Sequence, residues 1–221
     1  MKRHFDDELA GLKKSILQMS TLTQRAIYSS VESLKKLDCE LAKFVIGDDK
    51  AIDKLENEIN EQCLDMLALH QPMASDLRLI AMTMNIVTDL ERMADLAVDI
   101  AQRTLEICDK PLLKPLIDIP KLALLAQEMT QRATDAFLNG DIESAKNIIL
   151  LDSQADSLRD EVQRELVEEY LTKDPSTASR AVPLLLAARH LERICDHATN
   201  IAEDVIFLYS ARVVKHHKEL L

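Results

Sequence analysis

The chain contains the same carboxylate-bearing segment twice. DLERMADLAVDIA and HLERICDHATNIA occur 101 positions apart, and both contain the frame L-E-R-x-x-D. The frame places Glu91 four residues before Asp95, and Glu192 four residues before Asp196. Apolar residues recur around both frames at the spacing of an amphipathic helix, so each frame belongs to a helix that packs against others. The repeat therefore predicts two similar helical halves.

Prolines mark the connection between these halves. The segment CDKPLLKPLIDIP contains Pro111, Pro115 and Pro120 and cannot continue a helix. The chain has only 3 glycines and no tryptophan, and it is rich in leucine, alanine, glutamate and lysine, a composition typical of all-α proteins. The expected helices lie near residues 4–37, 41–69 and 72–108, and near 119–139, 141–171 and 175–216.

We therefore predict an all-α protein with six long helices in two tandem, internally duplicated three-helix bundles. The first bundle comprises residues 1–108, the connection residues 109–120 and the second bundle residues 121–221. Proline suits the first turn of a helix, so Pro72 and Pro175 are expected to open the third helix of each set, with Asp174 as an N-cap. A single six-helix array is the alternative.

Charge and cysteine content limit the possible partners and compartment. A net charge of −11 argues against binding to nucleic acid or to an anionic bilayer. The sequence shows no signal peptide and no apolar run of about 18 residues, so we expect a cytoplasmic protein without membrane insertion. The four cysteines are far apart and form no C-x-x-C motif, which predicts reduced thiols. They are Cys39, Cys63, Cys108 and Cys195.

Helical projection places the repeated acids away from the polar face of their helices. Glu91 and Asp95 align with Ile80, Met84 and Val87, on the arc expected to face other helices. A second group of polar residues is expected to point outward into solvent. In the two helices this group includes Asp89, Asp99, Arg103, His190 and His197.

Each half offers a second acid pair at the same spacing. These pairs are Asp49 with Asp53, and Asp152 with Asp156. Four carboxylates from neighbouring helices, without histidine, suit hard cations such as magnesium, calcium, manganese or iron. The alternative is that arginines on neighbouring helices neutralise the acids. The two sites need not be equivalent, because Glu56 corresponds to Arg159 in the second half.

Longer motifs resemble a known family. QPMASDLR at 71–78, leading into DLERMAD, and ARHLERICDHATNIAED in the second half resemble the PhoU proteins, which are phosphate-transport accessory and regulatory proteins of bacteria. The resemblance implies two three-helix bundles whose acid motifs hold multinuclear metal clusters of iron, manganese, magnesium or zinc. Where family members often have glycine, this chain has Ala94 and Cys195, which would narrow the sites. The matching residues are Asp49, Asp53, Glu91, Asp95, Asp152, Asp156, Glu192 and Asp196.

The resemblance also implies a regulator and not an enzyme. Such a protein couples the ATPase subunit of a phosphate ABC transporter to a membrane sensor histidine kinase. It restrains phosphate uptake and the starvation response when phosphate is plentiful. We expect a homodimer, because helical pairs with leftover apolar stripes commonly self-associate. Two rivals remain: a carboxylate-bridged metalloenzyme, such as a hydrolase that activates water, and a metal-free helical adaptor.

Overall fold

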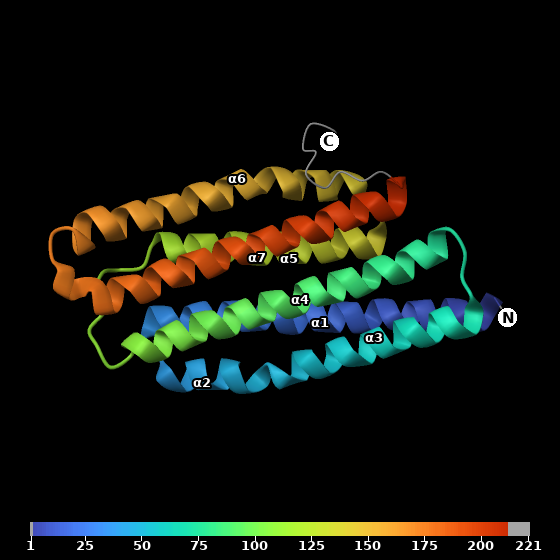
Figure 1. The fold of residues 1–221 in the computed structure, drawn as a ribbon, viewed down its shortest axis with the longest axis horizontal. Helices are drawn as coiled ribbons and strands as arrows, with labels where there is room; N and C mark the ends of the chain where they lie inside the picture. The colour runs from blue at the N-terminus through green and yellow to red at the C-terminus, as the bar shows by residue number, and fades with distance from the viewer. Residues whose placement is uncertain (1, 212–221) are drawn as a thin grey trace.

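The structure, a computed structural model, describes residues 2–211 and is helical throughout its regular elements (Figure 1). The predicted all-α class is confirmed. A π-helical turn, Leu166–Leu171, and a 3₁₀ turn, Pro175–Thr177, precede the last helix. The α-helices are α1 (Lys2–Lys36), α2 (Cys39–Asp48), α3 (Lys50–His70), α4 (Ser75–Ile107), α5 (Asp118–Asn139), α6 (Ile142–Glu165) and α7 (Ala178–Ser210).

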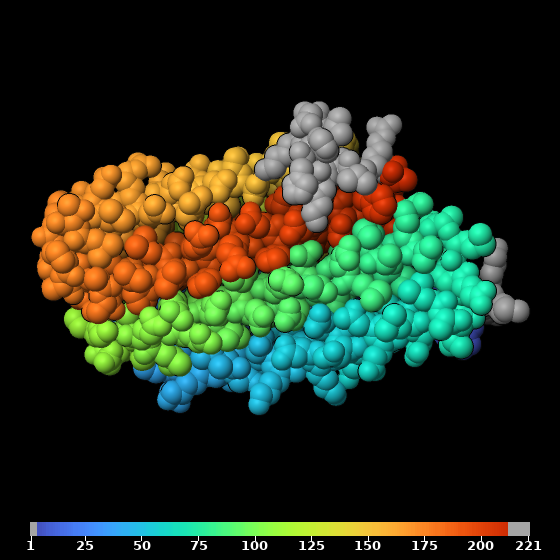
Figure 2. All heavy atoms as spheres, in the orientation of Figure 1, coloured from blue at the N-terminus to red at the C-terminus, as the bar shows by residue number. Residues whose placement is uncertain are grey.

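The helices run along the long axis of an elongated molecule. α2 and α3 lie along one edge and α6 along the opposite edge, with α1, α4, α5 and α7 between them (Figure 1). α4 packs against α7, and α1 packs against α5. The atoms of α4 and α7 meet along their shared length on the face seen in Figure 2. The two predicted three-helix bundles are therefore present. One core cluster holds most of their buried apolar side chains, and a small second cluster consists of Ala42, Val45 and Ala101.

Local sequence signals explain several helix ends. The side chain of Asp38 accepts hydrogen bonds from the backbone N–H groups of Glu40 and Leu41 at the start of α2, as expected for an N-cap. Gly140 ends α5 with a φ of 72°, a conformation that glycine adopts without strain. Asp174 is an N-cap as predicted, but Pro175 opens a short 3₁₀ turn and not the long helix, and α7 begins at Ala178.

Other helix boundaries differ from the predictions. The expected helix over 41–69 is two helices, α2 and α3, which meet at Asp49. Pro72 does not open α4; the helix begins at Ser75, because Gln71 and Ala74 adopt positive φ values and reverse the chain first. α6 ends at Glu165, where the π-helical turn begins. Residues 212–216 of the last predicted helix lie outside the described residues.

The connection between the bundles is fastened to the second bundle. Pro183 lies inside α7 and cannot donate a backbone hydrogen bond to the Ser179 carbonyl. Lys110 Nζ donates to that same carbonyl oxygen at 3.5 Å. Arg180 donates to the carbonyl oxygen of Pro111 at 3.3 Å. These bonds fix the connection on α7 and help to set the register of the two halves.

The prediction that all four thiols are reduced is wrong for two of them. Cys39, at the start of α2, forms a disulfide with Cys108, just after α4. The helical hairpins bring these positions together although 69 residues separate them, which the spacing of the cysteines does not reveal. Cys63 and Cys195 are free and buried, as expected for thiols that fill the core.

The disulfide is expected to stabilise the first bundle. Closing a loop of this length restricts the unfolded chain, so Cys39→Ser/Cys108→Ser should lower the free energy of unfolding by about 2–4 kcal/mol. Urea denaturation measures this change. A reducing agent should shift the wild type by a similar amount and leave the double variant unaffected. Denaturation of the wild type that does not respond to the reductant would contradict the prediction.

Candidate metal centre

The first carboxylate cluster lies between α3 and α4. Asp49 sits where α2 meets α3, and its side chain does not cap the helix that follows. Asp53 lies in the first turn of α3, and Glu91 and Asp95 lie one turn apart on α4. Sequence reasoning omitted Glu56 from the ligand set, although it lies on the same face of α3 and within electrostatic reach of Glu91. The first cluster is therefore Asp49, Asp53, Glu56, Glu91 and Asp95.

The acids of the first cluster sit beside the core, not inside it. Asp49, Asp53 and Glu91 are partly buried, and Asp95 is exposed. Fully buried positions of α4, such as Leu90 and Ala94, face the bundle interior instead. Glu91 therefore lies at the edge of the arc that the projection assigned to helix contacts, and Asp95 lies outside the buried part of that arc.

Burial and mutual repulsion raise the pKa values of these acids. Partial burial, together with Asp95, raises the pKa of Glu91 to about 7. Partial burial, together with Asp53, raises the pKa of Asp49 to about 6. The pKa of Asp95 is raised by burial first and by Asp53 next. Arg92 opposes the shift at Glu91 and Asp95 without cancelling it, and a bound cation would add further positive charge.

The second carboxylate cluster lies between α6 and α7. We define it as the four predicted acids Asp152, Asp156, Glu192 and Asp196. Burial raises the pKa of Glu192, with Asp196 adding to the shift and Arg159 opposing it. Burial raises the pKa of Asp196 as well, and Asp152 contributes next.

Arg159 makes the second cluster different from the first. Its Nη2 atom lies 3.1 Å from an Asp156 oxygen and 3.6 Å from a Glu192 oxygen. Arg159 follows Asp156 by three residues, just as Glu56 follows Asp53. The second half thus places a cation where the first half places a fifth acid. The alternative that arginine neutralises the acids therefore applies in part to the second cluster.

The carboxylates of each cluster lie too far apart to hold one ion in their present positions. Within the part of the chain that the structure describes, no three carboxylate oxygens of either cluster lie within 4.8 Å of one another. Like charges at this spacing repel, so binding one cation through several oxygens would require the side chains to rotate inward. The donor set, which consists of oxygen atoms alone, fits hard cations. One turn beyond Glu56, the buried Asn60 Oδ1 has no hydrogen-bond partner and adds a neutral oxygen to the same groove.

Several residues predicted to face solvent lie between the bundles. His197 Nδ1 lies 2.7 Å from Asp89 Oδ1, and both side chains are only 15% exposed. His190 Nδ1 lies 3.8 Å from Asp99 Oδ2. The prediction of an outward position is wrong for Asp89, His190 and His197, because helical projection of one half does not show that the other half covers this face. Asp99 keeps 43% of its side chain exposed. Arg103, also predicted outward, is partly buried.

The raised pKa of Glu91 predicts that the metal-free protein becomes less stable to unfolding as the pH rises. The group is protonated in both states below about pH 4.5, and between about pH 4.5 and 7 the unfolded chain loses that proton first. Its contribution to stability is therefore present at low pH and lost as pH rises through 7. With chelator present, Glu91→Gln should stabilise the protein at pH 8 by on the order of 1 kcal/mol, with allowance for solvent screening.

Denaturation of both proteins at pH 4.5 and pH 8 measures this difference. Glu32→Gln is the control of opposite sign, because hydrogen bonds from Lys36 and Lys35 lower the pKa of Glu32. That variant should lose stability at pH 8. A Glu91→Gln effect that is the same at both pH values would show that neither burial nor the neighbouring acids disfavour the charged form of Glu91.

Comparisons with known proteins agree with this geometry. The family model described as the PhoU domain matches residues 16–104 and again residues 119–205, one match in each half. A phosphate-specific transport system accessory protein PhoU homolog of Aquifex aeolicus is 41% identical over 209 residues, which cover 95% of this chain and 94% of that protein.

Solved structures share the fold as well. The crystal structure of PhoU from Pseudomonas aeruginosa superposes with a TM-score of 0.90 at 36% identity, covering 94% of this chain and all of that one. A phosphate transport system regulatory protein PhoU from Streptococcus pneumoniae gives a TM-score of 0.88 at 29% identity, covering 95% of this chain and 99% of the other. Matches in both halves, together with a relative above 40% identity along nearly the full length, show that the chain belongs to the PhoU family.

Proposed function

We propose that this protein is an accessory regulator of a phosphate transport system and that its two carboxylate clusters bind hard metal ions. The observation that carries the proposal is the match of both halves to one family whose named members are phosphate transport accessory and regulatory proteins. The eight predicted acids fall into two groups, one at the α3–α4 pair and one at the α6–α7 pair, which supports the metal-binding part of the proposal. A non-enzymatic role agrees with the names of these relatives.

The proposed partners are the ATPase subunit of a phosphate ABC transporter and a membrane sensor histidine kinase. When phosphate is plentiful, the protein restrains both phosphate uptake and kinase signalling. Long helices with a net charge of −11 provide acidic surfaces that suit basic patches on cytoplasmic domains of such partners. None of the described helices combines the length and the apolar character that a bilayer-spanning segment needs.

Metal ions on the clusters would tie the outer helices to the inner ones. Asp53 on α3 and Glu91 on α4 would hold one side each of a bound cation, as would Asp156 on α6 and Glu192 on α7. A hard cation supplies the positive charge that offsets the repulsion among these acids. The first cluster, with Glu56 and without an arginine like Arg159, should bind cations more strongly. Iron, manganese and magnesium are the preferred candidates, with zinc as a further one.

The disulfide bears on the proposed cytoplasmic location. Disulfides are rare in cytosolic proteins of mesophiles, although they occur there as redox-sensing bonds and are common in hyperthermophiles. Cytoplasmic partners require a cytoplasmic protein, so we propose that the Cys39–Cys108 bond forms and breaks with the redox state of the cell. Alkylation of thiols in intact cells, followed by mass spectrometry, reports this state directly.

Apolar residues on the surface support self-association. Leu69 and Met73, between the end of α3 and the start of α4, are 75% and 80% exposed. Leu77 on α4 is exposed nearby in sequence. We propose that a homodimer covers such residues, and light scattering on the purified protein measures the oligomeric state.

The regulatory role is tested in cells grown with abundant phosphate. Deleting the gene should raise expression of a phosphate-starvation reporter, and the wild-type protein should restore repression. Glu91→Gln/Glu192→Gln should fail to restore it if the clusters must bind metal, whereas Glu32→Gln should succeed at equal protein level. Pull-down of the purified protein with the ATPase subunit and with the kinase provides the direct readout.

A reporter that does not respond to the deletion, together with no binding to either partner, would overturn the proposed function. Full repression by the cluster variant would retain the adaptor role and remove metal from it. If added metal strengthens partner binding by the wild type but not by the cluster variant, metal binding and the regulatory role are linked.

A further inference from the structure

A different group of potential metal ligands lies at one end of the first bundle. His4 and Glu8 come from the first turns of α1, and His70 is the last residue of α3. His4 Nδ1 lies 2.9 Å from Glu8 Oε1, and His70 Nε2 lies 2.7 Å from Glu8 Oε2. Among the described residues, these are the only three histidine, cysteine or acidic side chains whose donor atoms all lie within 4.8 Å of one another.

We propose that His4, Glu8 and His70 form a binding site for one transition-metal ion of the zinc class. Two imidazole nitrogens and one carboxylate oxygen are a zinc donor set, with bonds of about 2.0–2.2 Å and tetrahedral geometry. Donor atoms around such an ion are about 3.3 Å apart. One donor atom from each of the three residues lies within 4.8 Å of the other two, so small side-chain movements would bring them to ligand positions. A water molecule would complete the coordination.

Helix geometry and packing position these three side chains close together. His4 and Glu8 are four residues apart on one face of α1, and the ring of Phe5 packs against His70 with centroids 4.9 Å apart. The side chains of Glu8 and His70 are 29% and 21% exposed, whereas His4 is 78% exposed. An ion could therefore reach the site from solvent past His4 and find the other two ligands already placed.

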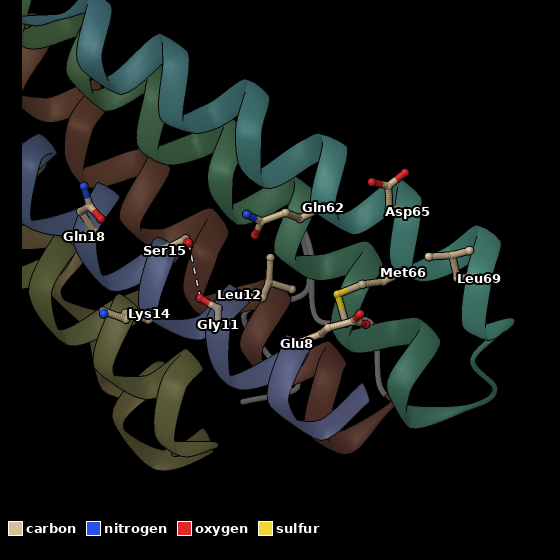
Figure 3. A pocket seen from close by; sticks show the side chains of 10 residues that line it. All are labelled: Glu8, Gly11, Leu12, Lys14, Ser15, Gln18, Gln62, Asp65, Met66 and Leu69. Atoms are coloured by element: carbon tan, nitrogen blue, oxygen red, sulfur yellow. Dashed lines mark hydrogen bonds between the residues drawn. The ribbon is translucent and has the colours of Figure 1, made fainter. Parts of the chain in front are cut away.

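A cavity beside the site provides room for the remaining ligand. It has a volume of about 610 Å³ and lies between α1 and α3, with Glu8, Leu12, Gln62 and Met66 in its wall (Figure 3). Figure 3 shows Glu8 at the end of this cavity, beside Met66 and Leu12. Because Glu8 belongs to both features, a water on the bound ion would have space at the cavity wall.

The site is distinct from the carboxylate clusters in chemistry and in position. The clusters offer oxygen atoms alone, which favour magnesium, calcium or manganese, whereas imidazole ligands favour zinc, copper, nickel or cobalt. A bound ion would join the start of α1 to the end of α3. It would therefore stabilise the closed end of the first bundle in proportion to the occupancy of the site.

The test is a zinc titration of untagged full-length protein by calorimetry, repeated with cobalt and followed by visible absorption. Tetrahedral cobalt with nitrogen ligands absorbs strongly, whereas cobalt surrounded by six oxygens does not. All proteins should carry His216→Gln/His217→Gln, because these two adjacent histidines lie outside the described residues and could bind zinc themselves.

We expect one zinc ion on this site and a tetrahedral cobalt spectrum. Loss of a residue that hydrogen-bonds to a metal ligand lowers metal affinity by about 10–100-fold. His4→Gln and His70→Gln remove direct ligands, so each should lower the zinc affinity by at least that factor. His4 is exposed, so its replacement cannot act through misfolding. The control Glu91→Gln/Glu192→Gln should retain both the zinc affinity and the spectrum.

Three results would overturn the proposal. One is zinc affinity and cobalt absorption that survive in both His4→Gln and His70→Gln. Another is loss of both signals in the carboxylate-cluster control while the histidine variants bind normally, which would assign the zinc to the clusters. The third is absence of zinc binding in the parent protein.

Discussion

Repulsion among carboxylates in half-buried grooves is the constraint on which the proposed role of this protein depends. Asp49 and Glu91 have pKa values raised to about 6 and about 7, because burial and neighbouring acids both disfavour their charged forms. The helix pairs α3–α4 and α6–α7 impose this cost by bringing acids of different helices into one groove. A cation that offsets the cost would favour the same helix packing, so metal occupancy and bundle stability are linked.

The two halves share a fold but handle this charge differently. Arg159 contacts Asp156 and Glu192 in the second cluster, and Glu56 adds a further acid to the first. In the first cluster Arg92 opposes the raised pKa values of Glu91 and Asp95, whereas in the second cluster Arg159 lies at hydrogen-bond distance from Asp156. The His4–Glu8–His70 group belongs to the first half alone. The first bundle thus offers more candidate metal ligands than the second.

Periodicity and repetition did not predict the break between α2 and α3 or the π-helical turn after α6, but they were sufficient for the all-α class and the internal duplication. They depend on residue spacing within single helices, which the sequence displays directly. Contacts between residues distant in sequence could not be predicted in this way. The Asp89–His197 contact and the Cys39–Cys108 bond join residues distant in sequence, and only the packing of α4 with α7 and with the start of α2 brings them together. The H-x-x-x-E spacing of His4 and Glu8 was a signal in the sequence, but His70 was not.

The most direct measurement is a crystal structure of the protein soaked in manganese, with anomalous scattering used to locate the ions. The account predicts anomalous peaks between α3 and α4, within ligand distance of Asp53 and Glu91, with weaker peaks beside Arg159 in the second cluster. The carboxylates of the first cluster should have rotated inward around the ions. Anomalous density absent from both grooves at saturating manganese would contradict the central claim and leave helix packing and partner docking to explain the repeated acids.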